Sequence, residues 1–476
     1  MITFLLYQFM RGLNLFILWF VVVMCGLNIV QVVLTLFITP AYIRKARHFE
    51  YRLIGASTNI IPISILVPAY NEEEAIVESV KSMLNLNFTN YEVVVINDGS
   101  QDNTLKAVIS AFNLHKVTFP VRERLATKKI RGIFYNPDIP RLKLVDKENG
   151  GKSDALNAGI NLSRFPYIVS LDADSLLEAD ALLRIAMAFM QHKYTIAVGG
   201  IIRVVNGCMV ENGKVIEAAL PKKKWALFQI VEYMRTFLVG RIGWNSINSL
   251  LVMKGAFGSF QKDAVISVGG YSAGTAGEDM DMIIKLHRYM RAKKYKYRVS
   301  FLPDPVCWTR VPESLDVLYM KRRRWQIGLM DVFGRYRDMF MNPRYGMLGM
   351  AAIPYMFFYE IVFPVVELLG YIMIPVAWYF GFLGFEALAL FLIAVVFFGI
   401  FASLGSLVVE DLTAVKFKKA REVILLSFLG IAENVFYRQI TSFFRLQGIL
   451  SYRKYKQTLG IMRHKKQPGA KKRSKE

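Results

Sequence analysis

The sequence predicts an α/β protein with a mostly parallel sheet and helices on both of its faces. Helices that span a membrane are expected at both ends of the chain. Two observations predict this class. Strand-like and helix-like stretches alternate between residues 60 and 200, which is typical of a parallel sheet covered by helices. Residues 13–39 carry no charge, and residues 351–382 and 386–409 are also apolar and long enough to cross a bilayer.

The composition agrees with a membrane protein. The chain has 476 residues, of which 54% are hydrophobic, yet it carries 60 Lys and Arg against 37 Asp and Glu, a net charge of +23. A nucleic-acid partner is not expected, because the basic residues lie beside the apolar spans and in the tail. The three cysteines are far apart and the five histidines are scattered. Neither a disulfide framework nor a zinc site is therefore expected.

The first half of the chain reads as four strand-and-helix units. Strands are expected at 61–67, 91–96, 141–145 and 167–171, and the helices that follow them at 72–84, 102–112, 152–160 and 179–190. In such sheets ligands bind beyond the carboxyl ends of the strands. Each motif found in this half lies at such an end.

Basic residues set the expected membrane topology. Arg44, Lys45, Arg47 and Arg52 follow the first span, so the N-terminus is expected outside and the next domain in the cytoplasm. Residues 422–447 form a third C-terminal segment, which is interrupted by polar residues and followed by a basic tail; a partly inserted or re-entrant segment is favoured. We expect an N-terminal transmembrane helix (1–45), a cytoplasmic domain with interfacial helices (46–345), transmembrane or re-entrant helices (346–450) and a basic cytoplasmic tail (451–476), its RHKKQPGAKKRSKE end disordered.

The stretch SLDADS, residues 170–175, places two carboxylates at the end of a buried strand. Asp172 and Asp174 repel each other there unless a cation lies between them and an anion. Carboxylates one residue apart can bind Mg²⁺ or Mn²⁺, with phosphate oxygens as the remaining ligands. A helix cap is the alternative, because Ser175 and Glu178 fit a capping box; both interpretations can hold together.

Three further stretches follow strands. PAYNEE (68–73) and NDGS (97–100) each read alone as a turn, although Tyr70, Glu72 and Asp98 could contact a nucleoside. NGGKSDALN (149–157) fails as an ATP-binding loop because Asp146 occupies the place of its first glycine. Its Gly150, Gly151 and Lys152 could still meet a diphosphate at a helix N-terminus.

The second half adds three motifs. GEDMD (277–281) begins a helix, so its acidic residues either complement the helix dipole or supply a general base, Asp279. KRRRWQIG (321–328) reads as a basic stretch at the membrane interface with Trp325 as its anchor, or as a site for a diphosphate and a sugar ring. GAFGSF (255–260) reads as a turn of small residues.

The order of these motifs, followed by apolar spans, resembles the membrane-embedded family-2 glycosyltransferases, such as cellulose, hyaluronan and poly-N-acetylglucosamine synthases. The resemblance covers about residues 10–450. It implies a GT-A fold, a nucleotide-sugar donor, usually UDP-linked, inversion at the anomeric carbon and a divalent metal, Mg²⁺ or Mn²⁺. It also implies a growing β-linked polysaccharide as acceptor, coupled to export, in the plasma (inner) membrane.

The resemblance assigns roles to matching residues. Binding of the donor is assigned to Tyr70, Glu72, Asp98, Lys152, Asp172 and Arg324, and binding of the metal to Asp174 and Asp172. Binding of the acceptor is assigned to Phe257, Gly258, Ser259, Glu278 and Trp325, and the role of catalytic base to Asp279. Two residues depart from the family pattern. Lys321 stands where the Q-x-x-R-W motif has Gln, a departure that concerns processivity and the acceptor side, and Gly277 stands where T-E-D has Thr.

Other functions are weighed against this one. A non-processive transferase that adds one sugar to a lipid or lipid-linked acceptor is the nearest, and product length separates the two. A polysaccharide-binding partner with an inactive site disagrees with the intact acidic residues. Glu360 and Glu367, seven residues apart within a span, favour a polar sugar channel, although an interfacial Glu360 and a Glu367 paired with a neighbouring helix are the alternative.

Overall fold

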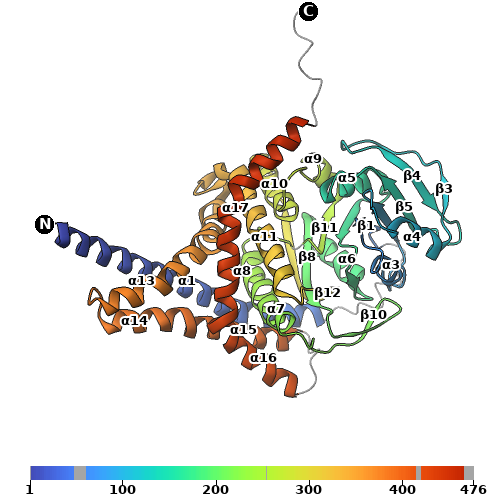
Figure 1. Cartoon of the computed structure of the whole chain (residues 1–476). Coiled ribbons are helices and arrows are strands. Elements are labelled where there is room, and N and C mark those ends of the chain that lie inside the picture. Colours follow the sequence, from blue (N-terminus) through green and yellow to red (C-terminus); the bar gives the residue numbers. More distant parts are fainter. Residues whose placement is uncertain (1, 48–59, 254, 414–419, 466–476) are drawn as a thin grey trace, which may run out of the picture.

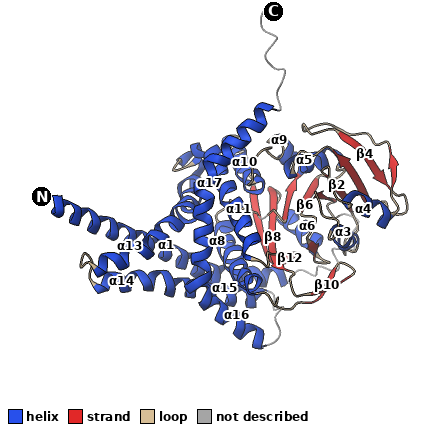
Figure 2. Cartoon of the chain, viewed as in Figure 1, coloured by secondary structure: helices blue, strands red, loops and turns tan. Residues whose placement is uncertain are grey.

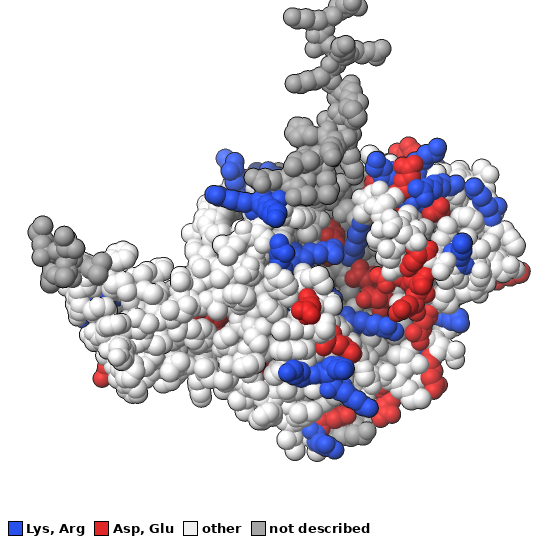
Figure 3. Space-filling view, viewed as in Figure 1, with Lys and Arg blue, Asp and Glu red and all other residues white. Residues whose placement is uncertain are grey.

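The protein is seen in a computed structural model that describes residues 2–47, 60–253, 255–413 and 420–465. A sheet covered by helices forms one part, and a bundle of long helices forms the other (Figures 1 and 2). Figure 3 shows that the bundle side is nearly free of charged side chains, whereas Asp, Glu, Lys and Arg crowd the sheet side. Arg52, which the topology prediction uses, lies outside the described residues.

The sheet has ten strands in the order β3-β4-β5-β2-β1-β6-β11-β8-β12-β7. The strands are β1 (Ile63–Ala69), β2 (Tyr91–Asn97), β3 (His115–Val117), β4 (Ile130–Tyr135), β5 (Leu142–Lys147), β6 (Tyr167–Leu171), β7 (Leu176–Leu177), β8 (Thr195–Val204), β11 (Phe257–Gln261) and β12 (Arg298–Thr309). β9 (Met209–Glu211) and β10 (Lys214–Glu217) form a separate hairpin.

The predicted α/β class is confirmed, with a mixed sheet. β5, β2, β1 and β6 are parallel neighbours, as expected from their strand-and-helix rhythm. β11 runs antiparallel between β6 and β8. The outermost strands also pair antiparallel with their neighbours: β7 with β12 on one side, and β3 with β4 and β4 with β5 on the other. The parallel centre brings the carboxyl ends of four strands to one edge of the sheet, where the sequence motifs lie.

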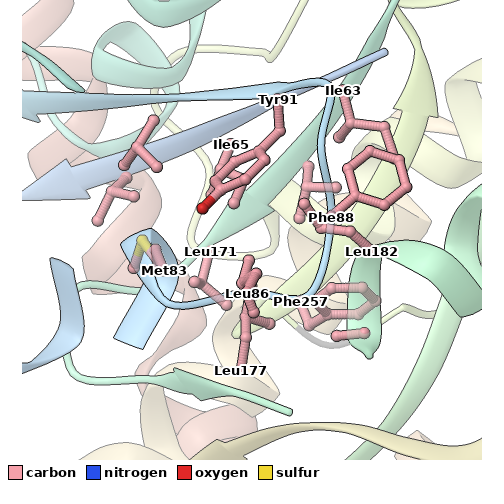
Figure 4. Close-up of a cluster of buried hydrophobic side chains, with 14 of the residues drawn as sticks. Ile63, Ile65, Met83, Leu86, Phe88, Tyr91, Leu171, Leu177, Leu182 and Phe257 are labelled. Carbon is pink, nitrogen blue, oxygen red and sulfur yellow. The ribbon is translucent and has the colours of Figure 1, made fainter. Parts of the chain in front are cut away.

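Helices cover both faces because side chains of a strand alternate between them. Ile65 and Val67 of β1 join the core under α3 (Ile76–Leu84), α4 (Thr104–Phe112) and α6 (Ala181–Gln191), which Figure 4 shows in part. Leu66 points to the other face, under α5 (Lys152–Leu162), α9 (Lys262–Ser267) and α10 (Glu278–Ala292).

Four helical stretches are long and apolar enough to cross a membrane: Tyr7–Pro40, Leu348–Tyr379, Phe385–Glu410 and Ala420–Lys456. The first lies in α1 (Ile2–Arg47), and the second comprises η4 (Leu348–Ala352), α12 (Ile353–Phe357), η5 (Phe358–Val362) and α13 (Phe363–Tyr379). The third comprises α14 (Phe385–Leu392), η6 (Ile393–Phe397) and most of α15 (Phe398–Thr413). The fourth comprises α16 (Ala420–Ala432), η7 (Glu433–Tyr437) and most of α17 (Arg438–Lys465). The first three agree with the predicted spans.

The last helical stretch is unbroken from residue 420 to 465. Figure 1 shows α17 running across the direction of α1 rather than alongside it. Full crossing therefore does not follow from length alone, and partial insertion stays a prediction. α17 continues to Lys465, so residues 451–465 of the predicted tail are helical, and α17 packs on α11 (Leu315–Arg335). An added Cβ on Gly334 would lie 3.4 Å from the hydroxyl of Tyr452, which shows how close the two helices come. Residues 466–476 lie outside the described part.

Two helical segments join the sheet to the bundle. The first comprises α7 (Lys224–Tyr233), η1 (Met234–Val239) and α8 (Gly240–Ser246), and Thr35 of α1 donates a hydrogen bond to the carbonyl of Val239. The second is α11, where Arg322 pairs with Glu232 of α7 and Arg323 donates to Ser451 of α17. Two short 3₁₀ helices, η2 (Arg337–Met339) and η3 (Pro343–Tyr345), lead from α11 to the second span, which begins with η4.

Candidate active site

One cavity of about 710 Å³ lies between the sheet edge and the helical bundle. The predicted residues that line it come from four elements: Lys152 from the start of α5, Asp172 and Asp174 from the turn after β6, Glu278 and Asp279 from the first turn of α10, and Arg324 and Trp325 from α11. Figure 3 shows acidic side chains gathered on this face of the sheet side with basic ones beside them. Seven of the predicted site residues are thus brought together.

Strand pairing positions the two aspartates. β11 runs antiparallel to β6 with Phe257 opposite Leu171, so the turn before β11 lies next to the turn after β6. The amide of Asp172 donates to the carbonyl of Ala256 at 3.4 Å, and the amide of Ser175 donates to the carbonyl of Asp172 at 3.1 Å. This closed turn holds both carboxylates at the cavity.

The predicted capping box is wrong. Ser175 precedes the short strand β7, and α6 begins only at Ala181. The hydroxyl of Ser175 donates to Asp174 at 3.3 Å, and Glu178 accepts a hydrogen bond from the indole of Trp308. Pairing of β7 with β12 displaces the helix start, which sequence spacing alone does not reveal.

Lys152 connects the carboxylates of the cavity. Its ammonium nitrogen lies 2.8 Å from Asp172, 3.5 Å from Glu278 and 3.9 Å from Asp279. Burial lowers the pKa of Lys152, but these three charges outweigh that and hold it well above its ordinary value. One permanent cation therefore ties the aspartate turn to the start of α10.

Asp279 has the character of a proton acceptor. Burial raises its pKa to about 7; Lys152 opposes the rise, while the charges of Glu278 and Asp172 add to it and Arg324 again opposes it. A carboxylate with a pKa near neutrality is both ionised in a useful fraction and basic enough to take a proton. The position at the first turn of α10 also means that the helix dipole favours its charged form.

Asp174 is enclosed without an ion pair within 4 Å among the described residues. Burial raises its pKa, and the charge of Asp172 adds to this, while Lys321 opposes it. Glu72 is influenced by the same pair, because burial and the charges of Asp174 and Asp172 raise its pKa to about 7. These acidic groups thus lie near one another, and a cation would relieve their repulsion.

Two glycine contacts shape the site. A Cβ on Gly255 would overlap the carboxylate of Asp279 and lie 2.8 Å from the ammonium of Lys152. A Cβ on Gly328 of α11 would lie 2.8 Å from the amide of Gly277, and one on Gly277 would lie 2.9 Å from the carbonyl of Gly328. Gly277, the departure from the Thr of T-E-D, therefore lets α11 approach the turn before α10.

Asp98 lies apart from the cavity. It is buried, its carboxylate pairs with Lys147 at 2.6 Å, and it accepts hydrogen bonds from the amides of Gly150 and Gly151. Those two amides are therefore used inside the protein, and the expectation that they meet a diphosphate is corrected. Tyr70 is 44% exposed at the same edge of the sheet. Nucleoside contacts by Tyr70, Glu72 and Asp98 stay predictions.

The predicted acceptor turn is also corrected. Phe257, Gly258 and Ser259 lie within β11, all three buried, and the hydroxyl of Ser259 donates to the carbonyl of Val198. Phe257 packs in the core shown in Figure 4. The turn that reaches the cavity is formed by the preceding Gly255 and Ala256. Small residues mark both a turn and a crowded central strand, so the sequence does not separate them.

Comparisons with known proteins agree with this geometry. Residues 64–237 match glycosyl transferase family 2, and residues 167–402 match glycosyl transferase family group 2. The chain therefore carries glycosyltransferase family 2 domains. Poly-β-1,6-N-acetyl-D-glucosamine synthases are among its relatives: that of Staphylococcus aureus (strain COL) is 29% identical over 282 residues, 59% of this chain and 57% of the relative. That of Staphylococcus epidermidis (strain ATCC 35984) is 27% identical over 294 residues, 61% and 60% of the two chains.

The chain thus aligns with less than two thirds of the length of these relatives. Among solved structures, a mannosyltransferase from Pyrobaculum calidifontis in complex with GDP-mannose and Mn²⁺ matches with a TM-score of 0.50. It is 16% identical, and the match covers 90% of this chain and 98% of that one. At this identity the likeness shows a shared fold.

The cavity also contains residues that the sequence motifs do not indicate as part of a site. Lys321, known from the sequence only as a departure, lines the cavity with its ammonium 5.7 Å from the ring of Trp325. Arg241 of α8 lines it too, and its charge interacts with Asp279. No motif signals Arg241, whereas the spacing of Lys321, Arg324 and Trp325 on one face of a helix was readable.

The cavity continues into the helical bundle. There its lining includes Trp244, Tyr355, Tyr359, Glu360 and Glu367. Tyr355 and Tyr359 stack at 5.3 Å, and Trp244 packs beside Tyr355 at 5.4 Å. Glu360 pairs with Arg445 of α17 and Glu367 with Arg438. The two glutamates are thus paired with another helix and also line the cavity, whereas the sugar channel and the interfacial position of Glu360 stay predictions.

Proposed function

We propose that the chain is an inverting transferase that moves N-acetylglucosamine from a UDP-linked donor to a growing β-linked polysaccharide. The relatives, which are synthases of poly-β-1,6-N-acetylglucosamine, support the choice of sugar. The single observation that carries the proposal is the continuity of one cavity from the aspartate turn to the membrane helices. A site for single additions does not require such a path.

A divalent cation, Mg²⁺ or Mn²⁺, belongs to this proposal. No group of three or more His, Cys, Asp or Glu in the described part of the chain forms a metal site by itself. Asp174, enclosed beside Asp172 and without an ion pair within 4 Å among the described residues, fits a metal whose other ligands are donor phosphate oxygens. When bound, the metal neutralises charge on the leaving diphosphate.

The chain's own cations complete the donor side. Lys152 binds Asp172 in the structure and lies at the cavity surface, so it is placed to turn toward a diphosphate. Arg324 and Lys321 supply two further positive charges from α11. Fixed cations around the leaving group stabilise the charge that develops as the glycosidic bond breaks.

Asp279 takes the proton of the acceptor hydroxyl. The hydroxyl oxygen attacks the anomeric carbon from the side opposite UDP, the bond to UDP breaks, and the proton passes to the carboxylate. One displacement converts an α-linked donor into a β-linked product. Gly255 leaves the space in which Asp279 can lie this close to Lys152.

The path into the bundle serves the product. A polar chain cannot cross hydrocarbon unaided, and the cavity offers stacked rings and ion pairs instead. With the first span oriented by the positive-inside rule, the catalytic domain lies in the cytoplasm and the product leaves to the outside.

The test is a donor screen with the purified full-length chain in proteoliposomes, read as released nucleotide and as the length and side of the labelled product. UDP-N-acetylglucosamine should give a long polymer that is recovered on the side opposite the added donor. A product of one added sugar on a lipid would overturn polymer synthesis. Turnover that survives Asp279→Asn would remove the assigned base.

A further inference from the structure

A second pocket, of about 460 Å³, lies at the opposite edge of the sheet from the aspartate turn. Its walls come from the starts of β8 and β12, the end of α10 and the loop after α8: His192, Tyr194, Asn248, Arg291, Tyr295, Lys296, Tyr297 and Arg298. β8 and β12 are parallel, so their amino ends open together at this edge, while the motifs occupy the other. The proposed function does not use this pocket.

The pocket is strongly basic. None of its eight lining residues is acidic, and the stretch RYMRAKKYKYR, residues 288–298, holds six Lys and Arg without an acid. Asp338, an acidic residue beside this stretch, already pairs with Arg288 at 2.9 Å. The positive charge is therefore not balanced locally, and it attracts an anion.

The side chains divide into those that build the pocket and those that remain available. Arg291 builds it, because it donates to the hydroxyl of Tyr297 at 2.8 Å and to the carbonyl of Tyr345 at 2.5 Å. The Nε of Arg298 is buried with no hydrogen-bond partner among the described residues. Lys296 is exposed and makes no ion pair within that part of the chain, and Tyr295 is 55% exposed.

Two contacts place the pocket beside the membrane helices. Tyr345, which accepts the hydrogen bond from Arg291, lies three residues before Leu348, where the second span begins. On the other side, the loop after α8 supplies Asn248, and α8 packs on the first span. An added Cβ on Gly243 of α8 would lie 3.9 Å from Gln31 of α1. The pocket therefore lies at the boundary between the spans and the sheet.

We propose that this pocket binds the phosphate headgroup of an anionic phospholipid. Phosphate oxygens accept charge-assisted hydrogen bonds from Lys and Arg, here Lys296 and Arg298. Basic clusters directly beside a span attract anionic lipid, and tyrosines such as Tyr295 are enriched at the level of the headgroups. The same phosphate chemistry could come from a soluble ion, but the position beside the second span favours the lipid.

The test titrates the purified full-length chain, in neutral detergent, with short-chain phosphatidylglycerol and follows binding by calorimetry. Phosphatidylglycerol should bind, and the double variant Lys296→Gln/Arg298→Gln should weaken binding by on the order of tenfold or more, since each cation contributes separately. The matched control is Lys106→Gln/Lys116→Gln, two exposed lysines of α4 and β3 at the far end of the sheet, and it should bind like the unchanged chain.

The remaining arms identify the source of the phosphate and guard against misfolding. Phosphatidylcholine and inorganic phosphate, titrated separately, should bind at least tenfold more weakly than phosphatidylglycerol. Equal binding of inorganic phosphate would assign the pocket to a soluble anion, and equal binding of phosphatidylcholine would overturn the role of charge; either result refutes the proposal. Unchanged UDP release by the double variant should show that it is folded, and loss of lipid binding in the lysine control would also refute the assignment.

Discussion

The two edges of the sheet carry charge in opposite ways. At the carboxyl ends of the parallel strands, acids and bases are enclosed together: Lys152 lies within 4 Å of Asp172, Glu278 and Asp279. At the amino ends, the second pocket has cations and tyrosines but no acid. An enclosed site for chemistry needs balanced charges because unpaired ones are costly to bury, whereas an exposed site for a headgroup only needs a surplus.

The largest effect is expected from removal of the general base, Asp279, at the charge-balanced edge of the sheet. Asp279→Asn keeps the shape of the side chain and cannot accept the proton, so turnover should fall by about 10²–10⁴-fold. UDP binding, measured by calorimetry in the same preparation, should change little because the donor cations remain. If UDP binding and turnover fall together, Asp279 would instead be a structural member of the network.

The next effect tests how tightly the balanced edge is built. Gly255→Ala places a methyl group against Asp279 and Lys152, and should lower kcat by about tenfold or more, as small displacements of reacting groups do. Gly12→Ala in α1, where an added Cβ meets nothing within 4 Å, is the matched control. Equal activity of the two variants would mean that the turn at Gly255 accommodates the methyl group without displacing Asp279 or Lys152.

The pH dependence follows from the raised pKa of Asp279. Because its pKa is about 7, the ionised fraction falls roughly tenfold per pH unit below that value and is nearly complete above pH 8. kcat/KM for the acceptor should therefore rise up to about pH 7 and then level off. A profile that is flat between pH 5 and 7 contradicts the assignment of the base.

The smallest effect concerns the departure in α11. Lys321→Gln restores the family residue and removes one donor-side cation, so KM for the nucleotide sugar should rise about three- to tenfold. The matched control is Arg323→Gln. Arg323 lies on another face of α11 and donates a hydrogen bond to Ser451, so its loss should leave KM unchanged. A change in product length without a change in KM would place Lys321 on the acceptor side.

Much of this was readable from the sequence because short, local signals set it. The four strand-and-helix units, the three apolar spans and the motif residues at strand ends follow from periodicity and spacing. The rest depends on long-range pairing. β11 begins 86 residues after the end of β6 and pairs with it in the sheet. This pairing buries Phe257 and Ser259 and leaves Gly255 at the cavity. The burial of Asp98 against Lys147, and the approach of Gly328 to Gly277, likewise exist only in the folded chain.

The anchoring of α11 has a mechanical consequence. Lys321, Arg324 and Trp325 line the cavity, while their immediate neighbours Arg322 and Arg323 bind Glu232 of α7 and Ser451 of α17. Rotation of α11 about its own axis would therefore move the cavity residues and the two anchoring arginines together. The helix therefore links the cavity to the bundle. In the proposed function, a shift of Trp325 during transfer would move the ion pair with α7 and the hydrogen bond with α17 as well.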